Sequence, residues 1–303
     1  MTISSAVPSR ETETTRSIGR GTVASGSVSE LASRIFAPGL LDGRVAVVTG
    51  GGTGLGLAAA VELTRCGARV LVAGRRAEVL DAAVAEIGGG ALAVPSDVRT
   101  ADGAERVVAT ALDAHGRLDV LVNNAGGQYF APAEAIAAKG WRAVHRLNVG
   151  ATELMSRTAY ELAFAPRRSG TILNVTLSPH HGLPGMTHSS AARAAVEGYT
   201  RALAREWSPI AVIALAAGHF RTDAISKYPE PVQRSAGRSV PLGRLGRPEE
   251  HAWLVALCAS PLGRALSGGV VTLDGGRDNW YGPWPPQGLL VDGEVPTEIR
   301  RSS

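Results

Sequence analysis

The chain has 303 residues, of which 45% are hydrophobic, and its formal net charge is +4 at pH 7. This composition supplies enough apolar surface for one large α/β domain. No basic stripe stands out, which argues against nucleic acid as a partner. No apolar run is long enough to cross a bilayer or to form a signal-peptide core, so we expect a cytoplasmic protein that is not bound to a membrane.

The two ends of the chain differ in composition from its middle. Residues 1–35 are rich in Ser, Thr, Gly and Arg and poor in large apolar side chains. Such a segment buries too little surface to offset the entropy of ordering, so we expect a disordered extension. The folded domain is predicted over residues 36–280. Residues 281–303 are expected to form an irregular tail that packs on a neighbour or covers a site.

Seven apolar runs with the composition of strands follow one another along the middle of the chain. They alternate with Ala- and Leu-rich helical stretches, which is typical of the Rossmann-type fold, a doubly wound parallel sheet of the α/β class. Ligands of such sheets bind at the carboxyl ends of the strands. The predicted strands cover residues 45–48, 70–73, 91–94, 120–123, 171–175, 210–215 and 270–273.

Two cysteines lie far apart within apolar helical patterns, at Cys66 and Cys258. Isolated thiols of this kind are typical of small core residues in a reducing compartment. Neither a disulfide framework nor a metal site is expected from them.

A glycine-rich stretch directly follows the first predicted strand. Residues 49–56 read Thr-Gly-Gly-Gly-Thr-Gly-Leu-Gly, and a helix is expected to begin near Gly54. The glycines let backbone amides approach a pyrophosphate, and the free amides of the first helical turn favour negative charge. The stretch therefore predicts a dinucleotide site, the alternative being a tight connection without a ligand.

The second predicted strand ends in two arginines, Arg75 and Arg76. Proteins that prefer NAD carry an acidic residue near this position to bind the ribose hydroxyls, and none is present here. A guanidinium instead pairs with phosphate through two parallel hydrogen bonds, which suits the 2′-phosphate of NADP. We therefore expect NADP(H) as the cofactor, the alternative being that both arginines are solvated residues at a helix start.

Four further motifs follow the glycine-rich stretch in order: Asp97-Val98, Asn123-Asn124-Ala125-Gly126, Asn148 and Asp274-Gly275-Gly276. Together the five resemble the short-chain dehydrogenase/reductase superfamily over about residues 36–280. The resemblance implies an active-site asparagine at Asn148 and a bound nicotinamide dinucleotide. The residues expected to bind that cofactor are Gly50, Thr53, Gly54, Leu55, Gly56, Arg75, Arg76, Asp97, Val98, Asn124, Ala125, Gly126, Arg193, Gly218, Phe220 and Thr222.

The sequence departs from that superfamily at the proton donor. Members carry Tyr-x-x-x-Lys on the helix after the fifth strand, with both side chains on one face, and this chain has no such pair. Alignment of the helix places Ser189 at the tyrosine and Arg193 at the lysine. Leu177 stands at the register of the superfamily's serine, with Ser178 one step later. The predicted catalytic residues are Asn148, Ser178, Ser189 and Arg193.

The missing phenol distinguishes two reactions. Ketone reduction places full negative charge on one oxygen, so a positioned acid is close to essential, and an aliphatic hydroxyl is a far weaker acid than a phenol. Reduction of an α,β-unsaturated thioester spreads the charge over an enolate, which hydrogen-bond donors stabilise. Residues 188–194, His-Ser-Ser-Ala-Ala-Arg-Ala, also resemble the trans-2-enoyl-CoA and 2,4-dienoyl-CoA reductases. We therefore expect an NADPH-dependent reductase of an enoyl thioester.

Two other functions stay open at this point. A carbonyl reductase would need a substitute acid, and the candidates near the site are His180, His181, His188 and Tyr129. A protein without redox activity would have lost hydride chemistry together with the tyrosine.

The substrate side and the assembly carry further expectations. Leu183 and Met186 are expected to form an apolar pocket wall, and residues 222–238 to cover the substrate and move on binding. Superfamily relatives assemble through one long helix and the last strand, so a homodimer or homotetramer is expected. A helix is predicted over residues 141–165. Its candidates for the buried interface between subunits are Leu154, Met155, Leu162 and Phe164.

Overall fold

The computed structural model describes residues 36–279, except for positions 179, 224, 226, 227, 229, 230, 232, 234, 235 and 238. The predicted extension 1–35 and tail 281–303 lie outside the described residues, as does part of the predicted covering segment. None of the described helices is long and apolar enough to span a membrane.

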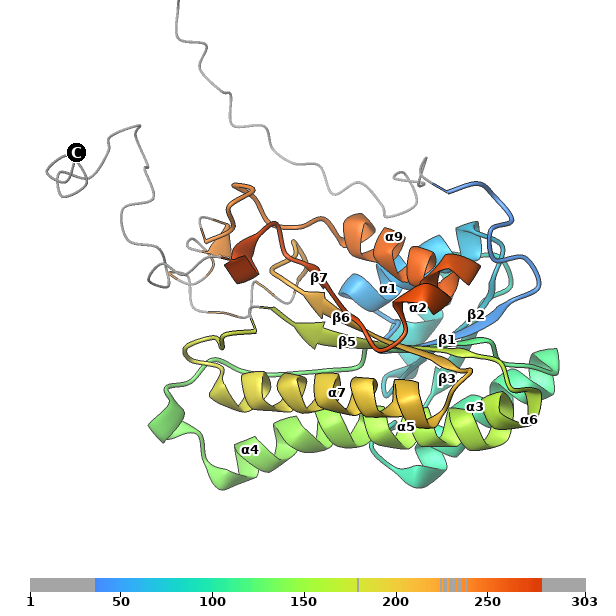
Figure 1. The fold of residues 1–303 in the computed structure, drawn as a ribbon, viewed down its shortest axis with the longest axis horizontal. Helices are drawn as coiled ribbons and strands as arrows, with labels where there is room; N and C mark the ends of the chain where they lie inside the picture. The colour runs from blue at the N-terminus through green and yellow to red at the C-terminus, as the bar shows by residue number, and fades with distance from the viewer. Residues whose placement is uncertain are drawn as a thin grey trace, which may run out of the picture.

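Seven parallel strands form one sheet, in the order β3-β2-β1-β4-β5-β6-β7 (Figure 1). Parallel strands buried on both faces are continuous apolar runs, which is why the sequence predicts them well. All seven predicted strands are confirmed, with ends that differ by at most two residues. The strands are β1 (Val45–Thr49), β2 (Arg69–Gly74), β3 (Leu92–Pro95), β4 (Val120–Asn123), β5 (Thr171–Leu177), β6 (Ala211–Ala217) and β7 (Val270–Leu273).

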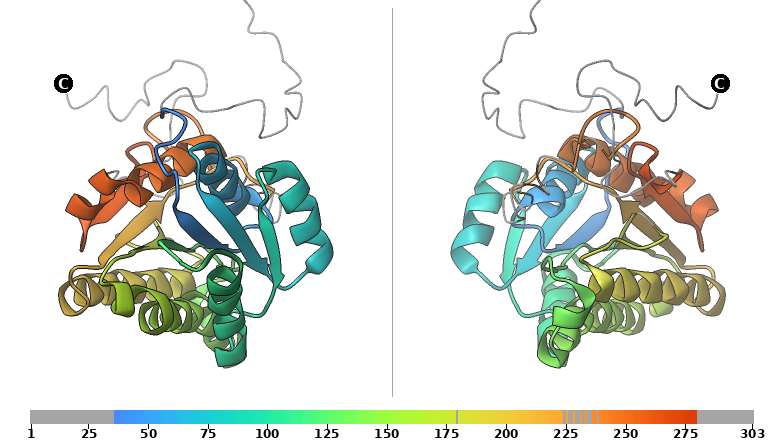
Figure 2. Two further views of the ribbon diagram at one scale, coloured as in Figure 1. Left: turned by 90° about the vertical axis from the view of Figure 1, so that its right-hand side faces the viewer. Right: turned by 90° about the vertical axis from the view of Figure 1, so that its left-hand side faces the viewer.

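Helices connect the strands and cover both faces of the sheet (Figure 2). The main helices are α1 (Gly54–Arg65), α2 (Ala77–Ile87), α3 (Ala101–His115), α4 (Ala138–His145), α5 (Ala151–Ala159), α6 (Ala165–Arg167), α7 (Thr187–Glu206) and α9 (Pro248–Ala259). Shorter helical segments are η2 (Ala133–Ala135), η3 (Arg146–Gly150), η4 (Tyr160–Phe164), η6 (Pro261–Leu266) and η7 (Arg277–Asn279). The predicted single α/β domain of Rossmann type is confirmed.

Two hydrophobic clusters hold the layers together. Residues of β1 alternate between them: Ala46 and Val48 pack with α1, α2 and α9, whereas Val45 and Val47 pack with α3, α5 and α7. This alternation follows from the two-residue period of a strand. Both cysteines are fully buried in the first cluster, as the sequence predicts.

One long helical element covers residues 138–167, because α4, α5 and α6 continue into one another through the π-helical segments η3 and η4. It confirms the helix predicted over 141–165. Two of the interface candidates are wrong, since Met155 and Phe164 point inward and are buried in the second cluster. Leu162 is 44% exposed and remains available for a partner.

Candidate active site

A cleft of about 680 Å³ lies at the carboxyl ends of the strands, where the sheet order reverses between β1 and β4. Its volume is in the range of small-molecule sites. Every residue that the sequence predicts for the cofactor lines this cleft. The fold therefore brings together side chains that are spread over residues 50–222 of the sequence.

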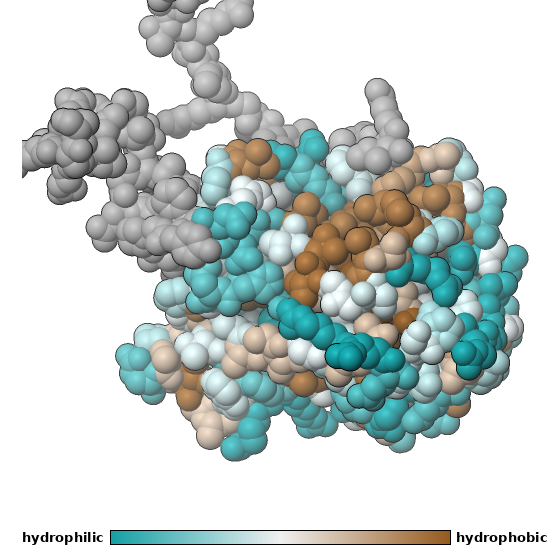
Figure 3. Space-filling model, viewed as in Figure 1, coloured by the Kyte–Doolittle hydropathy of each residue, from teal (hydrophilic) through white to brown (hydrophobic). Residues whose placement is uncertain are grey.

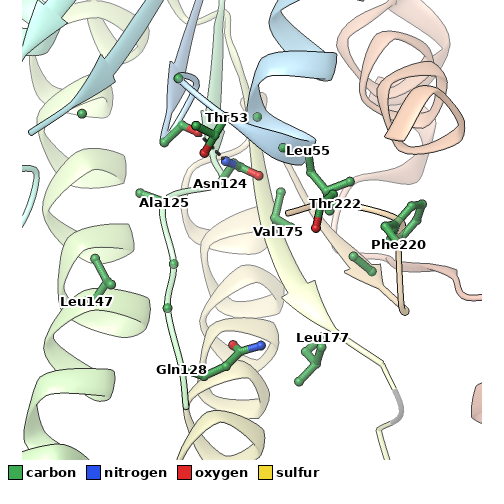
Figure 4. Close-up of a pocket in the computed structure, with 18 of the residues that line it drawn as sticks. Thr53, Leu55, Asn124, Ala125, Gln128, Leu147, Val175, Leu177, Phe220 and Thr222 are labelled. Carbon is green, nitrogen blue, oxygen red and sulfur yellow. Dashed lines mark hydrogen bonds between the residues drawn. The ribbon is translucent and has the colours of Figure 1, made fainter. Parts of the chain in front are cut away.

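The glycine-rich stretch forms one wall of the cleft, between β1 and α1. Gly50 has φ +65°, and a Cβ on Gly56 would lie 2.4 Å from the carbonyl oxygen of Gly50. Both positions therefore require glycine. Asn124 fixes the turn by donating from Nδ2 to the carbonyl oxygens of Thr49 and Gly50, at 3.0 and 3.2 Å (Figure 4).

The first turn of α1 faces the cleft. Thr53, the residue before α1, has an extended backbone, and its side chain caps none of the helix amides. The first amides of a helix have no partner within it and carry partial positive charge. This wall of the cleft is thus suited to a pyrophosphate.

Positive charge gathers at the end of β2. Arg75, Arg76 and Arg99 line the cleft there. Arg99 is paired with Asp97 at 2.6 Å, and its hydrogen bonds are the main reason that the pKa of Asp97 is lowered to about 2. No ion pair of Arg75 or Arg76 occurs among the described residues, so these two guanidinium groups remain for a ligand.

Arg193 lies on α7 and also lines the cleft. It is 9% exposed, and its Nη1 donates to the carbonyl oxygen of Val175 at 2.7 Å. Its Nε has no hydrogen-bond partner, and no carboxylate pairs with it among the described residues. Burial lowers the pKa of Arg193 to about 10. A buried cation without a protein counter-charge points to a ligand that accepts hydrogen bonds.

Ser189 lies one helical turn before Arg193 and is fully buried. Its Oγ donates to Oε1 of Gln128 at 3.0 Å, and Nε2 of Gln128 donates to the Tyr228 hydroxyl at 3.1 Å. Gln128 and Tyr228 line the cleft, whereas Ser189 does not. The predicted catalytic role of Ser189 is therefore corrected to the positioning of Gln128. Figure 4 shows Gln128 and Leu177 facing each other across this end of the cleft.

Asn148 positions the segment that carries Gln128. Its Oδ1 accepts from the Gly127 amide at 3.2 Å, and its Nδ2 donates to the carbonyl oxygens of Gly127 and Val144 at 2.8 and 2.9 Å. The side chain of Asn148 does not line the cleft. Its contacts support a positioning role rather than contact with a reacting atom.

The structure does not bring Ser178 to the cleft. Successive residues of a strand point to opposite faces, so Leu177 lines the cleft while the Ser178 hydroxyl donates to Asp274. Ser178 is also fully buried. The predicted catalytic role of Ser178 is therefore corrected to a structural one, the anchoring of the turn after β7.

The candidates for a substitute acid also lie away from the cleft. His180 bridges Asp278 and Glu197. Burial alone would lower the pKa of His180, but the hydrogen bond to Asp278 and the charge of Glu197 raise it overall. The ring of Tyr129 packs edge-on against His188, and its hydroxyl points toward Gly140 of α4. None of these side chains lines the cleft, and neither does that of His181.

Leu183 and Met186 do line the cleft, as predicted. The roles of Gln128 and Tyr228 could not be predicted from the sequence, because their hydrogen bonds join residues that are 61 and 100 positions apart and leave no local pattern. The one available signal was that both residues fall in segments already assigned to the site.

Comparison with known proteins agrees with the fold and the cleft. Residues 50–278 match the family model described as enoyl-(acyl carrier protein) reductase. A relative from Bacillus subtilis named "Probable 2,4-dienoyl-CoA reductase" is 35% identical, over 81% of this chain and 100% of its own length. A Synechocystis protein named 3-oxoacyl-[acyl-carrier-protein] reductase is also 35% identical, over 78% of this chain and 97% of its own.

Among solved structures, a citronellol catabolism dehydrogenase from Pseudomonas aeruginosa superposes with a TM-score of 0.72. It is 35% identical, and the match covers 80% of this chain and 98% of that one. The cleft at the switch point, the glycine-rich turn and these matches lead to one conclusion: the chain belongs to the short-chain dehydrogenase/reductase family and is an oxidoreductase of that type.

Proposed function

We propose that this protein uses NADPH to reduce the carbon–carbon double bond of an enoyl thioester. The observation that carries the proposal is the reaction end of the cleft, where the buried Arg193 guanidinium has an Nε without a hydrogen-bond partner and no tyrosine of α7 lines the cleft. A fixed cation and hydrogen-bond donors stabilise the enolate that hydride addition to an enoyl thioester produces. The relative named as a dienoyl-CoA reductase supports the same substrate class.

The residues of the cleft fit a dinucleotide. The glycines of residues 50–56 have no Cβ atoms, which lets the backbone of the turn pack closely and keeps side chains out of this wall of the cleft. Nε of Arg193 is a buried donor without a hydrogen-bond partner. In the proposed complex the amides at the start of α1 bind the pyrophosphate, and Arg193 donates to the nicotinamide ribose. The cofactor supplies the hydride. Leu177, Leu183 and Met186 give the substrate side an apolar wall suited to an acyl chain.

The preference for NADPH over NADH rests on Arg75 and Arg76. Converting both arginines to alanine is expected to remove about 1–3 kcal/mol of that preference, the scale of charge-assisted contacts to phosphate. Fluorescence titration of the wild type and the double variant with both cofactors measures it. The matched control is Arg106→Ala, an exposed arginine of α3 outside the cleft. Equal affinity of the wild type for NADPH and NADH would refute the assignment.

The function itself is tested by measuring NADPH oxidation in four reactions. Three contain crotonyl-CoA, a 2,4-dienoyl-CoA or a simple ketone, and the fourth contains no substrate. We expect turnover with a thioester and little with the ketone. Turnover with the ketone alone would establish the second candidate, a carbonyl reductase, which the similarity to a 3-oxoacyl reductase favours. Cofactor binding without turnover of any substrate would leave a protein without redox activity.

We further propose that the protein is a homodimer or homotetramer. β7 is an edge strand with an incompletely buried face, and Figure 3 shows apolar surface gathered over β7 and α9. Leu262, in the segment that follows α9, is 63% exposed. Contiguous apolar surface of this kind marks association sites. Light scattering at micromolar concentration is expected to give a multiple of the 31.3 kDa chain mass; a monomer mass would contradict it.

A further inference from the structure

A tyrosine from the segment after β6, Tyr228, lines the cleft. Tyr228 is the only tyrosine among the described residues that line it. Its backbone is held by two hydrogen bonds, since its amide donates to the Ile225 carbonyl at 3.1 Å and its carbonyl accepts from Nε2 of Gln233 at 2.7 Å. These two hydrogen bonds fix the backbone of Tyr228 on both sides of its side chain.

The hydroxyl of Tyr228 accepts a hydrogen bond from Gln128 and donates none among the described residues. Oε1 of Gln128 accepts from Ser189, so its Nε2 faces Tyr228 and donates to the phenol oxygen. No acceptor receives the Tyr228 O–H among the described residues. A hydroxyl that accepts one hydrogen bond and donates none within the protein is free to donate to a substrate.

A cation lies beside this phenol. The Arg193 guanidinium is close enough to Tyr228 for the two groups to interact electrostatically, and both side chains line the cleft.

The other side chains that could donate a proton here are either outside the cleft or in the wrong protonation state. Tyr129 and His180 do not line the cleft. His219 does, but burial, followed by the charge of Arg277, lowers its pKa to about 3, so the imidazole is neutral at pH 7. A neutral imidazole is a much weaker acid than an imidazolium.

We propose that Tyr228 replaces the missing helix tyrosine and donates the proton that completes reduction. The proposal rests on the proposed function. After hydride addition to the β-carbon, the double-bond electrons form an enolate. Its electron pair then forms the new C–H bond at the α-carbon with the Tyr228 proton, the phenol O–H bond breaks, and solvent returns a proton to the phenolate. Each turnover consumes one hydride and one proton. Ser189 and Gln128 position the phenol.

The test compares Tyr228→Phe with Tyr129→Phe, a matched loss of one phenol oxygen outside the cleft. Crotonyl-CoA is reduced with NADPH in D₂O, and the configuration of deuterium at the α-carbon of the product is determined. For Tyr228→Phe we expect turnover to fall by about 100-fold, the scale of a lost general acid. In the wild type, deuterium should enter on one face of the α-carbon. In Tyr228→Phe it should enter on both faces, because bulk solvent then supplies the deuteron. Tyr129→Phe should match the wild type in both measurements.

A second readout separates proton donation from cofactor positioning. The dissociation constant of NADPH, measured by fluorescence without substrate, should stay within about twofold in Tyr228→Phe because the phenol is assigned no part in cofactor binding. Wild-type turnover with single-face labelling in Tyr228→Phe would overturn the role of Tyr228 and leave the enoyl reductase standing. Slower turnover with single-face labelling, or a large loss of NADPH affinity, would also overturn it. An inactive wild type would defeat the proposed function and this inference together.

Discussion

Replacing Arg193 by alanine is expected to lower kcat/KM for NADPH-dependent reduction by about 100-fold and to weaken NADPH binding as well. The guanidinium is buried at the cleft, and its Nε lacks a protein partner. A hydrogen bond from a charged group contributes about 1.5–3 kcal/mol, and each 1.4 kcal/mol is a factor of ten. Arg193→Lys should retain part of the activity, since it keeps the charge but loses the planar fork. Steady-state kinetics and cofactor titration measure both effects.

Stability provides the control for Arg193. The charge is buried without a counter-charge among the described residues, and burial already lowers its pKa to about 10. An apolar residue of similar length should be tolerated by the fold, so Arg193→Met is expected to melt at or above the wild-type temperature while losing activity. An inactive Arg193→Met that also unfolds at lower temperature would show that the residue serves the fold. Full activity in the alanine variant would show that the helix alignment is wrong.

The strands and the glycine-rich turn after β1 could be predicted because their causes are local. A parallel strand buried on both faces requires an unbroken apolar run, as in β1, where all five residues are buried. The turn requires glycine at Gly50 and Gly56, for backbone conformation at one and for close backbone approach at the other. The apolar run and the two glycines each lie within a stretch of ten residues, so both features can be recognised from the local sequence.

The reaction end of the cleft could be predicted only in part. Arg193 follows from the period of one helix, and the structure brings it to the cleft. Ser178 fails because a shift of one residue along a strand turns a side chain to the other face. The link from Ser189 through Gln128 to Tyr228 joins three loops or helix ends. Its geometry depends on how β4, β5 and β6 lie side by side, which no single segment encodes.

The largest effect on stability is expected at the amino-terminal ends of the strands, at Asp119, which directly precedes the central strand β4. This carboxylate is 1% exposed at the start of β4. It accepts from the Val45 amide at 2.9 Å, from Arg117 at 2.7 and 2.8 Å, and from Arg167 at 3.1 Å. Asp119 therefore ties β1, β4 and the end of the long helix together. Removal of one partner of a buried ion pair typically destabilises a protein by about 3–5 kcal/mol.

Asp119→Ala is expected near the lower end of that range, because the Arg117 and Arg167 side chains are 41% and 33% exposed and can be hydrated again. Urea denaturation at pH 7 measures the free energy of unfolding. Glu153→Ala is the matched control, since it breaks an exposed pair with Arg157 and should change stability by less than about 1 kcal/mol. Equal, small effects of the two substitutions would contradict the role of Asp119.

The effect of Asp119 should also depend on pH in a defined direction. Burial raises the pKa of Asp119, but hydrogen bonds from Arg117, the Val45 amide and Arg167 outweigh it, so the pKa is lowered overall. The unfolded chain therefore binds this proton more readily than the folded one, and the stabilisation is complete above the unfolded pKa of about 3.9. It is lost as the pH falls through the lower folded pKa. The difference between wild type and Asp119→Ala should thus be constant from pH 5 to 8 and shrink in stronger acid, and a difference that grows in acid would show that the carboxylate does not act through its charge.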